Sequence, residues 1–321
     1  MKVIDHINRA YQNSHQSQNI QFSYEIVPPL RGSSAKDIVA VVESLAKLNP
    51  PWIDVTSHSS TTYYQEKNDG TILKRTLRKR PGMLGICGII QNRFKIDTVA
   101  HVLCLGFSKE ETEDALIELN FLGIENVLAL RGDAPNFEKP FRPDRTINQQ
   151  AADLVMQIQD LKSGQFLDDL DKSSSMDFCV GVAGYPEKHF EAASLKLDIQ
   201  NLKKKVEAGA DYIVTQMFFD NTKYFKFVEM CRAEGISIPI IPGLKMLKSA
   251  AQLRSLPKNF YIDLPDELVD QVTKNPEKAS EIGYQWTKKQ IEGLIAHGEK
   301  NIHLYVLNNV DSVSSVVKSF L

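Results

Sequence analysis

The first residue that could do chemistry is a single carboxylic acid, Glu25, which lies in the strand-like run 22–27 and is followed at once by Pro28 and Pro29. Side chains of a strand alternate between two faces, and in an interior strand both faces are buried. A buried carboxylate is costly to ionise unless a neighbour compensates for the lost water. Glu25 alone therefore fits an ion pair as well as it fits a proton donor or acceptor.

Other polar side chains stand at the ends of other strand-like runs. Arg131 can grip a phosphate or hydroxyl, and Asp133 places a carboxylate two residues away. Gln216 offers an amide donor and acceptor to the edge of a heterocycle. Phe218 and Tyr185 can pack on a flat ring. Together they predict a site for a polar, partly aromatic ligand.

Each of these residues also has a structural interpretation. Arg131 and Asp133 could form an internal ion pair, His101 could be a hydrogen-bonded core histidine, and Phe218 could simply pack in the core. The set carries more weight than any member, because packing alone seldom puts so many functional side chains at the ends of successive strands.

The elements that must position these residues alternate along the whole chain. The strand candidates are 22–27, 52–56, 100–105, 126–131, 178–185, 212–219, 238–242 and 302–307. The helical segments expected between them are 35–48, 109–122, 147–161, 191–208, 222–234 and 277–298. Such alternation indicates an α/β protein with a parallel sheet.

Two closures of that sheet compete, an open doubly wound sheet and a (β/α)8 barrel. Eight strands in a chain of 321 residues favour the barrel, and no G-x-G-x-x-G fingerprint follows a strand. We therefore expect one (β/α)8 TIM barrel domain over residues 1–321, with an extra N-terminal helix. The carboxyl ends of its strands would meet at one rim, where barrel enzymes have their active sites.

Composition excludes several classes of protein. With 38 basic and 40 acidic residues the net charge is −2, so we expect no nucleic-acid or membrane partner. The basic cluster 74–80 is interpreted as a solvated helix face rather than a binding patch. Ligand spacings such as H-E-x-x-H, a nucleophile elbow and a Walker loop are absent, so no metal is predicted.

The cysteines and the N-terminus predict the cellular compartment. None of the four cysteines forms a C-x-x-C pair, and they are interpreted as reduced core residues. The N-terminus lacks the apolar region of a signal peptide, and no segment is long and apolar enough for a membrane span. We expect a cytoplasmic protein.

Several motifs in order resemble one known family. They are Ser23–Pro29 (SYEIVPP), Leu128–Asp133 (LALRGD), Tyr185–Glu187 (YPE) with His189, Asn201–Ala210 (NLKKKVEAGA), Thr215–Asp220 (TQMFFD) and Ile240–Gly243 (IIPG). As an ordered group spanning residues 20 to 308, they resemble the 5,10-methylenetetrahydrofolate reductase family. Any single motif would be weak, but the order and extent are specific.

The resemblance implies an FAD-containing (β/α)8 barrel. NADH or NADPH would reduce the flavin and leave, and methylenetetrahydrofolate would then be reduced to 5-methyltetrahydrofolate at the same place. It also implies a cytoplasmic homo-oligomer that serves methionine biosynthesis. Because the chain ends with the predicted barrel, we expect no regulatory extension of the kind that larger eukaryotic forms carry.

The resemblance also assigns roles residue by residue. Glu25 matches the general acid that helps protonate N10 of the folate and open the five-membered ring to an iminium at N5. Asp133 matches an aspartate that contacts the pterin and influences the flavin, while Gln216 and Phe218 match substrate contacts. The positions that match the cofactor site are Thr56, His101, Leu130, Arg131, Gly132, Asp133, Ala151, Tyr185, His189, Asp198, Asn201 and Lys205.

Departures from the family pattern leave alternatives open. The chain has its own residues at 57–60, at Ala250 and at Asn309, and it carries an extra segment near 61–85. These differences bear on the folate tail and on the choice between NADH and NADPH. The alternatives are a folate-binding methyltransferase without flavin, and a catalytically degenerate barrel that acts as a binding or regulatory subunit.

Overall fold

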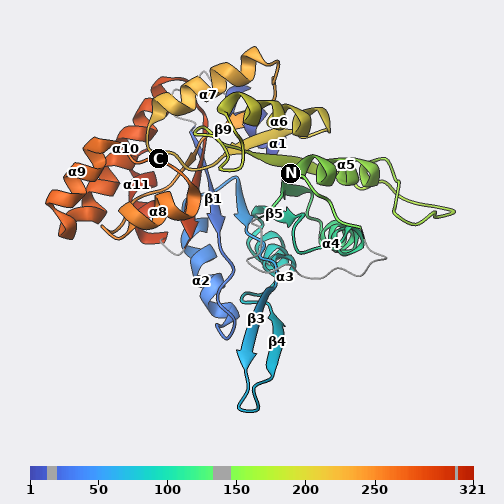
Figure 1. Ribbon diagram of the computed structural model, residues 1–321. Helices are drawn as coiled ribbons and strands as arrows, with labels where there is room; N and C mark the ends of the chain where they lie inside the picture. The colour runs from blue at the N-terminus through green and yellow to red at the C-terminus, as the bar shows by residue number, and fades with distance from the viewer. Residues whose placement is uncertain (13–19, 133–145, 308–309) are drawn as a thin grey trace.

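The computed structural model describes residues 1–12, 20–132, 146–307 and 310–321 (Figure 1). At its centre is a sheet of parallel strands in the order β10-β11-β1-β2-β5-β6-β7-β8-β9. The strands are β1 (Gln21–Ile26), β2 (Trp52–Val55), β5 (Asp97–Leu103), β6 (Asn126–Leu130), β7 (Cys179–Gly184), β8 (Tyr212–Thr215), β9 (Ile240–Ile241), β10 (Gly243–Leu244) and β11 (Asn301–Leu307).

The sheet closes at a strand that is split in two. Only Pro242 separates β9 from β10, yet β9 pairs with β8 while β10 pairs with β11. A proline has no N–H to donate to a neighbouring strand, so Pro242 interrupts the hydrogen bonding while the chain continues along the sheet. The two end strands of the sheet are thus one segment, and eight such segments form the predicted α/β TIM barrel.

Helices surround the strands, and the six helical segments predicted from the sequence are confirmed. The helices are α1 (Val3–Gln12), α2 (Ala35–Ala46), α3 (Met83–Ile89), α4 (Lys109–Phe121), α5 (Ala151–Lys162), α6 (Leu195–Glu207), α7 (Asn221–Ala233), α8 (Gln252–Phe260), α9 (Asp266–Lys274), α10 (Ala279–Ala296) and α11 (Val310–Lys318). Within the described ranges, none of these helices combines the length and apolar character that crossing a bilayer requires.

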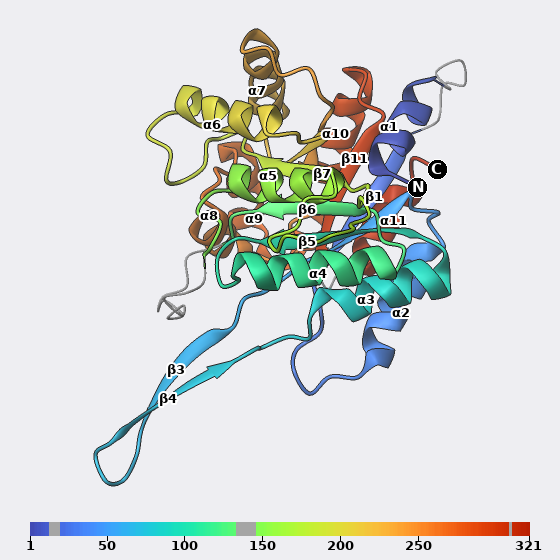
Figure 2. The ribbon, with the colours of Figure 1, turned by 90° about the vertical axis from the view of Figure 1, so that its right-hand side faces the viewer.

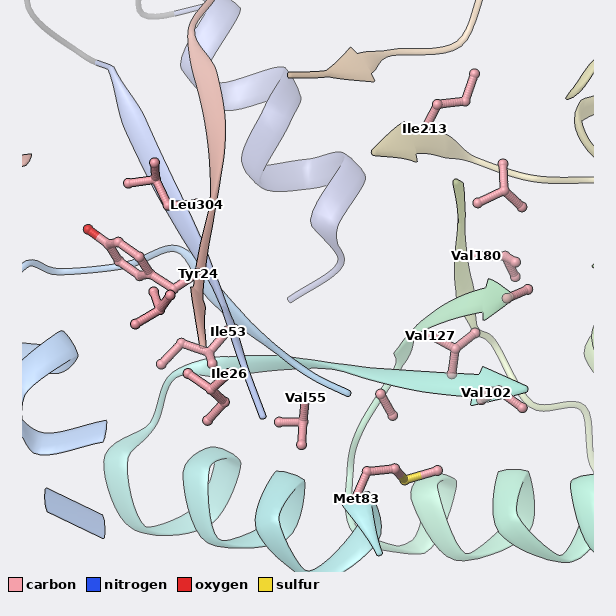
Figure 3. Close-up of a cluster of buried hydrophobic side chains, with 14 of the residues drawn as sticks. Tyr24, Ile26, Ile53, Val55, Met83, Val102, Val127, Val180, Ile213 and Leu304 are labelled. Atoms are coloured by element: carbon pink, nitrogen blue, oxygen red, sulfur yellow. The ribbon is translucent and has the colours of Figure 1, made fainter. Parts of the chain in front are cut away.

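The alternation of side chains divides the strands into an outer and an inner face. Tyr24 and Ile26 point outward and pack with Ile53 and Val55 into the apolar layer between the strands and the helices (Figure 3). Glu25 points inward instead, and lies at the cavity described below. The two faces of the first strand therefore agree with the prediction.

The extra N-terminal helix belongs to a second apolar cluster at the start of the barrel strands. Val3 and Ile7 of α1 pack there with Trp52 and Tyr212, and the Val3 N–H donates to Asn126 Oδ1 at 2.8 Å. This end of the barrel interior is filled by side chains, which leaves the opposite end for a ligand.

The extra segment after β2 is a β-hairpin, formed by β3 (Thr61–Glu66) and β4 (Ile72–Leu77), which projects away from the barrel (Figures 1 and 2). The prediction that the basic cluster 74–80 forms a helix face was wrong, because its first half lies in β4. Aromatic and β-branched residues favour a strand, and Gly70 supplies the left-handed backbone of the turn, with φ 77°.

Candidate active site

A cavity of about 390 Å³ opens at the carboxyl ends of the barrel strands. Its size is within the range of small-molecule sites, and its walls mix polar and aromatic side chains. The structure brings most of the predicted site residues together there. Those that line the cavity are Glu25, Thr56, His101, Leu130, Arg131, Gly132, Tyr185, His189 and Gln216.

Two of the three predicted residues of α6, Asp198 and Lys205, support the cavity wall from behind. The Asp198 carboxylate accepts the backbone N–H of His189 at 2.9 Å, and Lys205 Nζ donates to the Ala183 carbonyl at 2.7 Å. Burial lowers the pKa of Lys205 to about 8. Asn201 is exposed one turn before Lys205. Asp198 and Lys205 thus adjoin the lining residues His189 and Ala183 without entering the cavity.

Two predicted residues lie elsewhere, and one cannot be placed. Phe218 is fully buried in the outer core, stacked on Tyr224 with ring centroids 5.2 Å apart, and it is not part of the cavity wall. Ala151 is a buried residue at the start of α5 and also lies off the wall. Asp133 lies outside the described residues, so its predicted contact with the pterin stays a prediction.

Glu25 lies at the inner end of the cavity among ionisable side chains. In the strand register it is paired with Asp54 of β2, so both side chains point into the barrel. Glu25 Oε2 is 3.7 Å from His101 Nε2, and the same nitrogen is 3.4 Å from Asp54 Oδ2. Asp54 Oδ1 is in turn 3.8 Å from Nδ1 of His303. Four adjacent strands therefore contribute one buried acid–imidazole cluster.

The surroundings of Glu25 make it an acid that keeps its proton near neutral pH. Burial raises the pKa of Glu25 from its ordinary value of 4.5 to about 7. His101 and Lys245 oppose the rise, whereas the Asp54 carboxylate adds to it. A carboxylic acid with this pKa can donate a proton at the pH of a cell. Of the two interpretations of Glu25, the geometry favours the proton donor.

This cluster contains residues that the sequence analysis missed. Asp54, His303 and Lys245 each stand alone in an apolar or mixed run, where a single polar residue gives little signal. Lys245 Nζ donates to the Tyr305 carbonyl at 2.8 Å, and the Tyr305 hydroxyl donates to the Thr215 carbonyl at 2.7 Å. The signal that could have found them is position, because each follows the inward-facing alternation of its strand.

The outer rim of the cavity is aromatic, and it too was missed. The rings of Phe190 and Tyr261 stack with centroids 4.4 Å apart, and both are partly exposed. Tyr261 ends α8 with a left-handed backbone, φ 55°, and Lys188 of the same wall has φ 85°. Such strained backbone is uncommon outside glycine and is frequent at ligand sites.

Besides His101 Nε2, which faces Glu25 and Asp54, two polar atoms of the wall are buried without a hydrogen-bond partner among the described residues, namely Thr56 Oγ1 and Arg131 Nε. The far end of the Arg131 guanidinium is ion-paired with Glu191. Buried polar atoms in native proteins usually have partners, so these two are suited to meet polar atoms of a ligand. Gly132 beside them has φ 83°, a conformation that most side chains disfavour.

Replacing Glu25 with glutamine is expected to change how stability depends on pH. Between pH 4.5 and about 7 the folded protein keeps a proton that the unfolded chain releases, so the folded state loses stability as the pH rises. Glutamine removes this loss. We expect equal free energies of unfolding near pH 4, and a variant more stable by about 3 kcal/mol at pH 8. Urea unfolding measures both, and equal stability at pH 8 would contradict the raised pKa.

The sequence matches the methylenetetrahydrofolate reductase family over residues 10–320. The "5,10-methylenetetrahydrofolate reductase" of Buchnera aphidicola is 30% identical over 321 residues, which cover 97% of this chain and 95% of that protein. "Methylenetetrahydrofolate reductase (NADH) 1" of Arabidopsis thaliana is 30% identical over 320 residues, 96% of this chain and 49% of that protein. The chain thus spans about half the length of the plant relative.

One solved structure agrees with the fold. An uncharacterized protein from Clostridium thermocellum, described as binding two copies of 5-methyl-5,6,7,8-tetrahydrofolic acid, superposes with a TM-score of 0.58 over 97% of each chain. Its sequence identity is 13%, so this likeness supports the fold alone. The match over almost all of the sequence decides the family, and the chain belongs to the methylenetetrahydrofolate reductases.

Proposed function

We propose that this protein reduces 5,10-methylenetetrahydrofolate to 5-methyltetrahydrofolate with NADH or NADPH, through a bound FAD. The observation that carries the proposal is Glu25, an acid with a pKa of about 7, which shares one cavity with Gln216 and with most residues that match the family's cofactor site. A methyl-group product fits a role in methionine biosynthesis, and we expect a cytoplasmic homo-oligomer.

The residues of the cavity fit a flavin dinucleotide. Thr56 Oγ1 and Arg131 Nε are buried polar atoms without a partner among the described residues, and they are suited to polar atoms of the ribityl chain or the phosphates. Gly132 lets the backbone approach a flat ligand. When bound, the flavin would accept a hydride from the nicotinamide and pass it to the folate.

The side chains of this chain would then activate the folate. The protonated Glu25 is suited to give its proton to N10, which opens the five-membered ring to an iminium at N5. Gln216 lines the cavity and its Oε1 accepts the Met217 N–H at 2.9 Å, so its NH₂ group is the part suited to donate to a ligand. The burial of Glu25 would strengthen its interactions with a bound substrate.

An absorbance spectrum is the direct test of the proposal. Purified protein, with FAD added if necessary, is expected to show the two bands of an oxidised flavin. Anaerobic NADH or NADPH should bleach them, and methylenetetrahydrofolate should restore them. A colourless protein that fails to take up FAD but binds folate would favour a flavin-free methyltransferase, and a flavin spectrum without turnover would favour a degenerate binding subunit.

The same experiment shows whether NADH or NADPH is the preferred reductant. Relatives carry both names, with NADH for the plant protein above and NADPH for a probable reductase of Caenorhabditis elegans that is 28% identical over 304 residues. Bleaching rates measured side by side with the two dinucleotides give their ratio for this chain.

A further inference from the structure

Asp54 is a carboxylate buried inside the barrel, one inward step below the cavity residue Thr56. It is fully buried, and neither of its oxygens accepts a hydrogen bond from any described residue. A buried carboxylate without donors is costly, so a nearby positive charge must offset its burial. The candidates are two imidazoles, His101 at 3.4 Å and His303 at 3.8 Å.

Of the two imidazoles, His101 is the one suited to carry the charge. Burial lowers the pKa of His303, whose Nδ1 lies 2.9 Å from the Ser23 hydroxyl, a neutral hydrogen-bond partner. Burial also acts to lower the pKa of His101, but contact with Asp54 and, once Glu25 is ionised, the Glu25 carboxylate act against it, and the net shift is upward. The buried pair is therefore Asp54 with His101.

A single nitrogen of His101 faces both acids. Its Nε2 lies 3.4 Å from Asp54 Oδ2 and 3.7 Å from Glu25 Oε2. The other charged group near Glu25 is Lys245, whose Nζ is already held by the Tyr305 carbonyl. His101 thus connects Asp54, which is fully buried in the barrel, to Glu25, which lines the cavity.

We propose that Asp54 is a positioning residue that keeps His101 protonated beside Glu25, so that the imidazolium stabilises the carboxylate left when Glu25 gives its proton to the folate. The inference rests on the proposed function, in which Glu25 is the acid. In this step a proton moves from the Glu25 carboxyl to N10. His101 keeps its own proton, Asp54 stays ionised, and Glu25 regains a proton from solvent after product leaves.

The short distance between His101 and Glu25 gives the positive charge of His101 a large effect on the ionisation of Glu25. Two unit charges less than 4 Å apart interact strongly away from bulk water, even at the effective dielectric constant of about 20 that suits protein sites. Without the imidazolium, ionising Glu25 would place a second buried carboxylate near Asp54, with Lys245 as the remaining positive charge that acts on Glu25. Asp54 would therefore act on the reaction through His101, without touching the substrate.

Asp54→Asn keeps the shape of the side chain and removes its charge. In protein labelled with ¹³C-histidine, NMR titration should find His101 mostly protonated at pH 7 in the parent, and titrating at least about one pH unit lower in the variant. Reoxidation of the reduced flavin by methylenetetrahydrofolate should be about ten-fold slower or more at pH 7.5, while flavin reduction by the nicotinamide stays within about two-fold. The lost rate should return as the pH falls and His101 regains its proton.

A second acid–histidine pair on the same strand is the matched control. Asp97 lies at the other end of β5, with its Oδ2 2.8 Å from Nε2 of His6. Asp97→Asn loses the contact with His6 and also the ion pair between Asp97 Oδ1 and the N-terminal ammonium, 2.7 Å apart, but should change neither the titration of His101 nor either half-reaction. The acid rescue in Asp54→Asn separates a role in proton chemistry from a merely structural one, because damaged packing does not recover on protonation.

The outcomes separate this inference from the proposed function. A His101 that is neutral at pH 7 in the parent overturns it, and that titration needs neither flavin nor turnover. If Asp54→Asn does not fold, the same parent titration decides: a charged His101 supports the proposal and a neutral one rejects it. Normal folate reduction in Asp54→Asn also overturns the positioning role of Asp54. If Glu25→Gln nevertheless loses folate reduction, the proposed function is still supported. Failure of the protein to bind flavin would instead reject the proposed function.

Discussion

Glu25→Gln is expected to slow the reduction of methylenetetrahydrofolate by about 10²–10⁴-fold, the usual contribution of a general acid, while flavin reduction by NADH or NADPH stays within about three-fold. Glutamine has nearly the same shape as the protonated acid but cannot release a proton. In the proposed cycle only the folate half needs a proton at N10, so the two halves should separate. Stopped-flow absorbance of the flavin measures each half in turn.

A second buried glutamate provides the control for this variant. Glu299 lies at the opposite end of the barrel, where burial also raises its pKa and the Tyr224 hydroxyl donates to it at 2.9 Å. Glu299→Gln should leave both half-reactions within about two-fold, although it removes a buried acid in the same way. Equal losses in both halves for Glu25→Gln would remove the general-acid role and leave Glu25 as a structural residue.

The barrel could be predicted because its signals repeat. Strand-like runs and helix-period runs alternate along the chain, and each strand end carries a polar or flexible residue that has no use in a core. The alternation in β1 predicts opposite faces for Glu25 and Tyr24, and the structure agrees, with Glu25 at the cavity and Tyr24 in the outer core. Once eight parallel strands are given, closure alone brings Glu25 and Gln216 to one rim, so the cavity follows from topology.

The remainder could not be predicted, because it depends on neighbours that are distant in sequence. The proposed role of Asp54 depends on its contacts with His101 and His303, which lie on strands far along the chain. Phe218 has a side chain suited to a ligand, and only the packing of Tyr224 against it shows that it faces the core. The hairpin 61–77 could not be predicted, because its charged residues suit an exposed helix as well as an exposed strand.

The split strand also escaped sequence analysis, although it decides how the barrel closes. Gly243 follows Pro242 and begins β10, where its N–H donates to Thr215 Oγ1 at 2.9 Å. A Cβ at this position would overlap the Thr215 carbonyl oxygen and lie 2.7 Å from Cε2 of Tyr305. Glycine is needed here for close approach between the two sides of the seam, because no side chain fits between them.

Gly243→Ala is therefore expected to lower the free energy of unfolding by about 2–4 kcal/mol, since neither the Thr215 carbonyl nor the half-buried Tyr305 hydrogen-bonded to it can move away cheaply. Gly85→Ala is the matched control, because Gly85 is exposed in α3 with no atom within 4 Å of its Cβ position. There alanine should raise stability by about 0.4–1 kcal/mol. Urea unfolding at one pH compares the two. Equal effects would mean that the barrel does not close tightly between β8, β10 and β11, and the shared cavity at its rim would lose its support.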